Sequence, residues 1–220
     1  MKSFLKAIAS AAMPNLTNKL RAANLLLDSP DSYLIKTGWF NSFLSGSPAR
    51  PDGTPLPWMN YSFVNFLEGR MSNSHRLFEY GSGFSTAFYA KHVMQVVSVE
   101  HDQDWFGHVV KGLPSNATVL MRKLDQGSEY EDSFLDYSQD TDIVVVDGRR
   151  RVKCCEIAFS RLKFDAVVVL DDSYREKYQP AFAIAKMQGF KSLRIQGLKP
   201  TGHWVEETTV FYRAENCLGL

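Results

Sequence analysis

The sequence predicts a doubly wound α/β domain, in which helices cover both faces of a mostly parallel sheet. Two segments, DIVVVD at 142–147 and DAVVVLDD at 165–172, are apolar on both faces of an extended chain, which is typical of central parallel strands. Strand-like and helix-like patterns alternate from Trp58 onward. The last two strand-like segments, 192–198 and 207–213, are separated by too few residues for a helical crossover, so we expect them to pair antiparallel.

Length and composition fit one domain with a sizeable core. The chain has 220 residues, of which 45% are hydrophobic. Residues 1–45 have a helical pattern, and residues 46–57 are rich in Gly and Pro, which favours a loop. We therefore divide the chain into an N-terminal helical extension with its loop, at 1–57, and the main α/β domain, at 58–220.

The expected helix at the N-terminus is amphipathic. Phe4, Leu5, Ile8 and Ala12 would share one face. Lys6 interrupts the apolar run, which argues against a signal peptide, and no stretch is long enough for a membrane span. Packing within the protein is the simpler interpretation of this helix, and weak contact with a membrane surface or a partner is the alternative.

The remaining elements follow from their apolar patterns and from the residues that end them. Runs of β-branched and aromatic residues predict strands at 76–80, 96–100, 117–122, 142–147, 165–172, 192–198 and 207–213. Amphipathic runs, two of which end near a glycine, predict helices at 61–71, 82–93, 104–113, 151–163 and 178–189. The acidic segment at 126–142 has the composition of a loop.

Charge and cysteine content exclude several classes of protein. The formal net charge is +1 and no long Lys/Arg block is present, so nothing indicates binding to nucleic acid. The three cysteines, Cys154, Cys155 and Cys217, are odd in number and form no C-x-x-C pair. Reduced thiols in a cytoplasmic protein are the simplest interpretation.

A glycine turn between the first predicted strand and the next helix indicates a ligand site. The turn begins at Gly81 and Gly83, but Thr86 stands where a dinucleotide fingerprint needs its third glycine. Glu79, two residues before Gly81, would repel a pyrophosphate but suits the ammonium group of S-adenosylmethionine. Glu100 ends the next strand, where an acid accepts hydrogen bonds from ribose hydroxyls, which NAD and S-adenosylmethionine share.

The motifs E-x-G-x-G-x-S-T and V-x-S-V-E-H-D resemble those of class I S-adenosylmethionine-dependent methyltransferases. A longer pattern over 51–220 is similar to a bacterial group associated with glycan biosynthesis. The resemblance implies the Rossmann-like methyltransferase fold, with its parallel sheet ending in one antiparallel hairpin. It also implies a set of cofactor-binding residues, namely Glu79, Gly81, Ser82, Gly83, Ser85, Thr86, Glu100, His101 and Asp147.

Carboxylates are expected at the rim of the same pocket, because Asp147 and the pair Asp171–Asp172 follow two neighbouring central strands. By resemblance to metal-dependent O-methyltransferases of the catechol and macrocin types, these three aspartates would hold Mg²⁺. A second interpretation makes Asp147 a general base without metal. Simple helix capping by Asp171 is a third. The arginines at 149–151 could neutralise the carboxylates or bind a phosphorylated or acidic acceptor, so we group Arg149 with Asp147 and Asp171 as catalytic candidates.

The function expected from these features is transfer of a methyl group to an oxygen of a sugar or another small hydroxylated acceptor. Two alternatives from other classes stay open. One is an NAD-dependent oxidoreductase, against which Glu79 and the missing third glycine count. The other is a non-catalytic Rossmann-like binding or assembly module. The sequence indicates neither the identity of the acceptor nor the oligomeric state.

Overall fold

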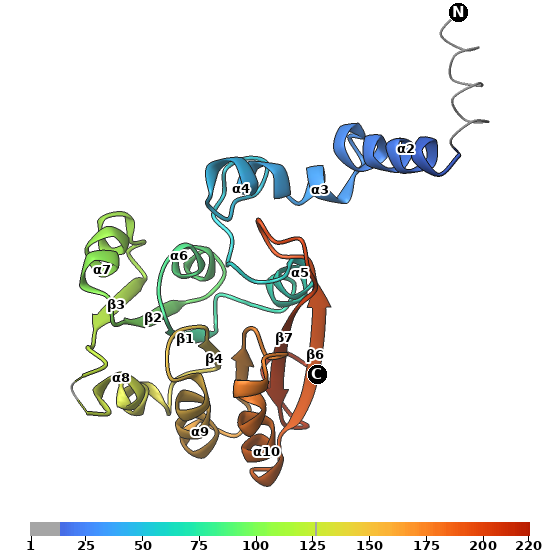
Figure 1. Cartoon of the computed structure of the whole chain (residues 1–220). Coiled ribbons are helices and arrows are strands. Elements are labelled where there is room, and N and C mark those ends of the chain that lie inside the picture. Colours follow the sequence, from blue (N-terminus) through green and yellow to red (C-terminus); the bar gives the residue numbers. More distant parts are fainter. Residues whose placement is uncertain (1–13, 126) are drawn as a thin grey trace, which may run out of the picture.

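A computed structural model describes residues 14–125 and 127–220 (Figure 1). It confirms the predicted α/β class, with a seven-stranded sheet in the order β3-β2-β1-β4-β5-β7-β6. The strands are β1 (Arg76–Tyr80), β2 (Gln95–Glu100), β3 (Ala117–Met121), β4 (Ile143–Val146), β5 (Val167–Leu170), β6 (Lys191–Gly197) and β7 (Glu206–Tyr212). All neighbours pair parallel except β7, which runs antiparallel to β5 and to β6. The predicted C-terminal antiparallel hairpin is therefore confirmed.

The order of the strands determines where a ligand can bind. The chain builds β1, β2 and β3 outward in one direction and then returns to place β4 on the other side of β1. The connections that leave β1 and β4 therefore diverge, and a crevice opens at the carboxyl ends of these strands. The glycine turn follows β1 and Asp147 follows β4, so both lie at this crevice.

Helices cover both faces of the sheet (Figure 1). The covering helices are α5 (Tyr61–Glu68), α6 (Phe84–Ala90), α7 (Gln103–Val109), α8 (Glu129–Asp132), α9 (Arg151–Arg161) and α10 (Gln179–Met187), and they are preceded in the chain by α2 (Pro14–Asp28), α3 (Tyr33–Lys36) and α4 (Trp39–Ser45). Ile143 and Val145 of β4 point into a core with α5 and α6, while Val144 and Val146 point into a core with α8, α9 and α10. Burial on both faces is why this strand is apolar throughout.

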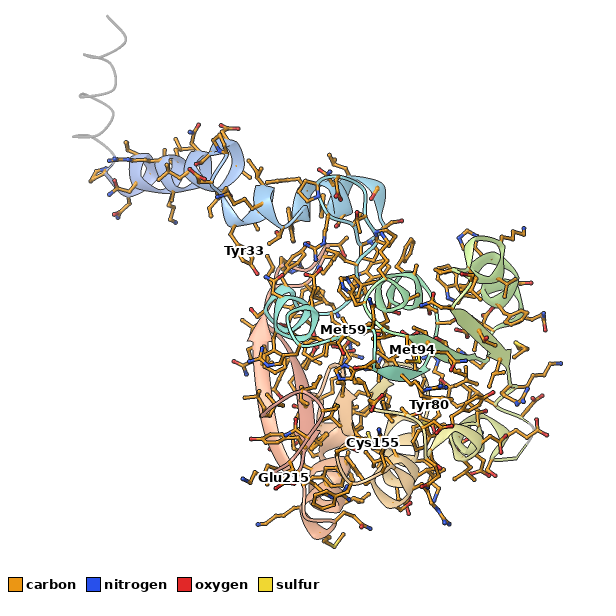
Figure 2. All side chains as sticks on the ribbon, turned by 180° about the vertical axis from the view of Figure 1, so that it is seen from behind. Tyr33, Met59, Tyr80, Met94, Cys155 and Glu215 are labelled. Atoms are coloured by element: carbon orange, nitrogen blue, oxygen red, sulfur yellow. The ribbon has the colours of Figure 1, made fainter. Side chains whose placement is uncertain are left out.

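The N-terminal helices form an arm that leads away from the sheet, and Tyr33 marks its approach to the body (Figure 2). No residue of α2 is buried, although its leucines are apolar. The chain contacts the body again at α4, where Trp39 Nε1 donates to the carbonyl oxygen of Gly202 at 2.8 Å. The predicted apolar face from Phe4 to Ala12 lies outside the described residues, and the domain boundary after residue 57 stays a prediction.

The prediction of a loop at 126–142 is wrong over part of its length. The helix α8 and a single 3₁₀ turn at Leu135–Tyr137 lie within this segment. Tyr130 and Phe134 are fully buried in the core beside α9. Their spacing of four residues places them on one side of a helical turn, and burial of two large rings outweighs the acidic composition around them.

None of the described helices is long and apolar enough to span a bilayer. Cys154 and Cys155 are buried on α9 and Cys217 is half-buried near the C-terminus, and all three are free thiols.

Candidate functional site

The turn between β1 and α6 needs glycine for both its backbone and its surroundings. Gly81 has φ 103° and Gly83 has φ 152°, which L-residues with side chains rarely adopt. A Cβ on Gly81 would lie 3.4 Å from the Cα of Gly148, and one on Gly83 would lie 3.2 Å from the ring of Trp105. The turn is thus held between the loop after β4 and the helix α7.

A cavity of about 440 Å³ opens beside this turn, at the carboxyl ends of β1, β2 and β4. Seven of the predicted cofactor-binding residues line it, namely Glu79, Gly81, Ser82, Ser85, Glu100, His101 and Asp147. Gly83 and Thr86 do not line it. They contact each other instead, since the Gly83 N–H donates to Thr86 Oγ1 at 3.1 Å. Arg149 also lines the cavity, whereas Asp171 and Asp172 do not.

Glu79 lies one residue before the end of β1, lines this cavity and is only 1% exposed. Its carboxylate accepts hydrogen bonds from Ser85 Oγ, from Thr86 Oγ1 at 2.7 Å and from Ser98 Oγ at 2.7 Å. Burial raises the pKa of Glu79 to about 7, and the three hydroxyls offset only part of this effect. A cation in the cavity would therefore favour the ionised form of this carboxyl.

Glu100 ends β2 and is also buried. Its Oε1 accepts from the backbone N–H of His101 at 2.7 Å and of Asp102 at 2.9 Å, and its Oε2 accepts from Ser82 Oγ at 3.0 Å. His101 Nδ1 lies 2.8 Å from the same Oε1, and Arg149 Nε donates to His101 Nε2 at 3.4 Å.

The rim carboxylates surround one guanidinium group, that of Arg151. Its nitrogens lie 2.7 Å from Asp147 Oδ1, 3.7 Å from Asp172 Oδ2 and 4.0 Å from Asp171 Oδ2. Arg149, the predicted catalytic arginine, instead contacts His101 on the cavity wall. The structure therefore brings the three aspartates together, with the third arginine of the run among them.

The rim does not fit the predicted metal. The Arg151 guanidinium lies where a cation bound by all three aspartates would sit, and Asp172 also pairs with Arg175 at 2.7 Å and with Lys199 at 3.4 Å. Within residues 14–125 and 127–220, no group of His, Cys, Asp and Glu side chains is arranged to hold a metal ion. We therefore correct the assignment of Asp147, Asp171 and Asp172 as Mg²⁺ ligands, because protein cations already balance their charge.

The three rim carboxyls differ in acidity. Burial raises the pKa of Asp147 despite the adjacent Arg151. Burial, together with the charge of Asp147, raises the pKa of Asp171 well above its usual range. Burial opposes ionisation of Asp172 as well, but Lys199 and the neighbouring arginines outweigh it and lower its pKa. Asp147 is thus the carboxyl that both lines the cavity and has the raised pKa of a proton acceptor.

Three residues that sequence reasoning missed or assigned otherwise shape the cavity. A Cβ on Gly148 would lie 2.1 Å from the hydroxyl of buried Tyr130, so only glycine fits there. Trp105 is 38% exposed and donates from Nε1 to the Ser82 carbonyl oxygen at 2.8 Å. The D-G pair after β4 was the available signal for Gly148, and no local signal existed for Tyr130.

Comparisons with known proteins identify the fold. No family model and no curated protein matches the sequence. Solved structures do match. A precorrin-6y C5,15-methyltransferase from Geobacter metallireducens is 16% identical, with a TM-score of 0.51 over 69% of this chain and 87% of the other. A precorrin 8w decarboxylase from Methanobacterium thermoautotrophicum is 15% identical, with a TM-score of 0.55 over 76% and 97%.

The N-methyltransferase NodS from Bradyrhizobium japonicum, solved in complex with S-adenosyl-L-homocysteine, is 15% identical, with a TM-score of 0.50 over 82% of this chain and 99% of the other. Likeness at this level of identity concerns the fold. The chain therefore has the Rossmann-like fold of class I methyltransferases.

Proposed function

We propose that the protein is an S-adenosylmethionine-dependent methyltransferase that acts on an oxygen of a sugar or another small hydroxylated acceptor. One observation carries the choice of cofactor. Glu79 and Glu100 flank the glycine turn at the cavity, and the hydrogen bonds to Glu79 come from hydroxyls rather than from cations. A cationic ligand would therefore supply the charge partner that favours the ionised form of Glu79.

The same charge disfavours NAD. A pyrophosphate at the glycine turn would meet the carboxylates of Glu79 and Asp147, both of which line the cavity. In our proposal Glu79 faces the ammonium group of S-adenosylmethionine. The Oε2 of Glu100, to which Ser82 is the one side-chain donor among the described residues, accepts from the ribose hydroxyls.

At the acceptor side, S-adenosylmethionine supplies an electrophilic methyl group and a thioether leaving group. Asp147 would accept the proton of the acceptor hydroxyl, which would leave the acceptor oxygen as the nucleophile for that methyl group. Arg151 fixes the Asp147 carboxylate at 2.7 Å, and Asp171 is held by a hydrogen bond from Thr208 Oγ1 at 2.6 Å. Alignment of the acceptor, the methyl group and the sulfur supplies the remaining catalysis, and no step needs a metal.

A thermal-shift comparison of S-adenosylhomocysteine with NAD tests the proposal. At 100 times its Kd, the true ligand stabilises the protein by about 2.7 kcal/mol. We expect S-adenosylhomocysteine to raise Tm and NAD to leave it unchanged. A shift with NAD alone would favour the oxidoreductase. A shift with neither would favour a non-catalytic module.

A second measurement tests the chemistry itself. Transfer of a labelled methyl group from S-adenosylmethionine to a panel of sugars and sugar phosphates would identify acceptors. We expect Asp147→Asn to lower the transfer rate by about 10²–10⁴-fold while S-adenosylhomocysteine still binds. Full activity of this variant would remove Asp147 from the mechanism.

A further inference from the structure

A second cavity adjoins the proposed cofactor pocket. It also measures about 440 Å³, and it lies between the start of α9 and the 3₁₀ turn before α10. Gly148, Arg149 and Arg151 line both cavities, so the two spaces adjoin each other at the loop after β4.

The two cavities have opposite charge. The cofactor pocket contains the carboxylates of Glu79, Glu100 and Asp147. The second cavity is lined by five cationic side chains and no acidic one, and we call it the basic cavity. The five cationic side chains are those of Arg149, Arg150, Arg151, Lys153 and Lys177.

Three of these five cations are already paired. Arg151 holds Asp147 at 2.7 Å, and Arg150 holds Glu131 at 2.9 Å and donates to the Gly127 carbonyl oxygen at 3.0 Å. Lys153 pairs with Glu156 at 3.0 Å on the exposed side of α9. In each of these pairs a carboxylate of the protein neutralises the charge of the cation.

Arg149 and Lys177 differ from the other three. Within the described parts of the chain, neither lies within 4.0 Å of a carboxylate. Arg149 contacts the imidazole of His101, and Lys177 lies over the ring of Tyr178, 5.0 Å from its centroid. Two full positive charges thus face one cavity without a protein anion, which is the arrangement that an anionic ligand neutralises.

We propose that the basic cavity binds the phosphate group of a phosphorylated, hydroxylated acceptor, with Arg149 and Lys177 as its ligands. This inference rests on the proposed function for its biological use, because the phosphate would anchor the acceptor while its hydroxyl reaches Asp147. Arginine contributes a bidentate fork and lysine a point charge, and together they match the oxygens of a phosphate ester.

Titration of the full-length protein with inorganic phosphate, followed by ³¹P NMR, tests the site directly. Glucose 1-phosphate, acetate and glucose serve as comparison ligands. We expect phosphate and glucose 1-phosphate to bind, acetate to bind at least tenfold more weakly, and glucose not to bind. Acetate binding as tightly as phosphate would overturn the assignment to phosphate in favour of a carboxylate.

Variants locate the binding. We expect Arg149→Met and Lys177→Met each to weaken phosphate binding by about tenfold, through loss of one charge-assisted hydrogen bond. Lys191→Met is the matched control, because it removes one charge from the start of β6, at the opposite edge of the sheet. Equal affinity in Lys177→Met and the wild type would refute the site. Lys177 is exposed, so its variant leaves the core intact.

Repeating the titration with S-adenosylhomocysteine present separates the two proposals. Phosphate binding that Lys177→Met weakens, without any binding of S-adenosylhomocysteine, would keep the anion site and reject the methyltransferase assignment. Binding of S-adenosylhomocysteine with no binding of phosphate would keep the methyltransferase assignment and reject the anion site.

Discussion

Two groups of carboxylates lie at the carboxyl ends of the parallel strands, and the structure balances their charge in different ways. Glu79 and Glu100, which lie at the carboxyl ends of β1 and β2, accept hydrogen bonds mainly from hydroxyls and backbone amides. Asp147, Asp171 and Asp172, which follow β4 and β5, surround the guanidinium of Arg151.

This difference decides which ligand each group can take. Neutral donors leave the charge of the first group uncompensated, so a cationic ligand gains from entering. Protein cations already compensate the second group, so a metal ion would have to displace them. Both groups consist of Asp and Glu residues at strand ends, so residue type does not distinguish them. The residues that donate hydrogen bonds to them or form ion pairs with them do.

The largest expected effect comes from removing the cation of the second group. Arg151→Met removes the cation beside half-buried Asp147 and buried Asp171, which costs about 3–5 kcal/mol of stability. Chemical denaturation with urea measures this loss. Lys153→Met, which breaks an exposed pair with Glu156, is the control and should cost less than about 1 kcal/mol. Equal losses in both variants would mean that Arg151 does not organise the rim.

Glu79 tests the first group through pH. Its pKa rises from 4.5 in the unfolded chain to about 7 in the folded protein. The unfolded state therefore releases this proton first, and the carboxyl lowers the free energy of unfolding as pH rises from about 4.5 to about 7. Between these two pH values, we expect the free energy of unfolding of Glu79→Gln to rise by about 3 kcal/mol relative to that of the wild type.

Denaturation at several pH values measures this gain. Glu176→Gln, at an exposed position, should follow the wild type throughout. If Glu79→Gln also follows it, the buried carboxyl does not carry the pH dependence. The same variant should bind S-adenosylhomocysteine more weakly, because it removes the charge that faces the ammonium group.

A third prediction concerns Glu100. Glu100→Ala removes a charged acceptor for ribose hydroxyls, which is worth about 1.5–3 kcal/mol per hydrogen bond. Calorimetry should therefore show S-adenosylhomocysteine affinity reduced at least tenfold. Glu156→Ala, on the exposed side of α9, should bind normally. Unchanged affinity in Glu100→Ala would contradict the placement of the ribose.

The smallest effect is expected where the two groups of carboxylates meet, at Gly81 and Gly148. Gly148→Ala places a methyl group 2.1 Å from the Tyr130 hydroxyl and 2.9 Å from the Gly81 nitrogen, so overpacking should cost about 1–3 kcal/mol. Gly107→Ala, in open space on α7, should be neutral or stabilising. Thermal unfolding distinguishes the two, and a stable Gly148→Ala would show that the loop after β4 can move.

Several features of this protein were determined by its sequence alone. Apolar runs on both faces predicted the central strands, because such runs are stable only between two helical layers. The short connection before β7 predicted the antiparallel hairpin, because a helix does not fit in it. The glycine turn with Glu79 and Glu100 predicted where the cavity lies, because strand ends in a parallel sheet share one edge.

Only the tertiary structure decided how the three consecutive arginines are used. Arg150 has a left-handed backbone, with φ 48°, so Arg149, Arg150 and Arg151 leave the chain toward His101, Glu131 and Asp147 respectively. Because the three residues are of one type and adjacent, the sequence does not indicate which arginine contacts which partner. Likewise, the burial of Tyr130 depends on α9, which follows later in the chain. Partners distant in sequence set these environments, and local patterns do not encode such partners.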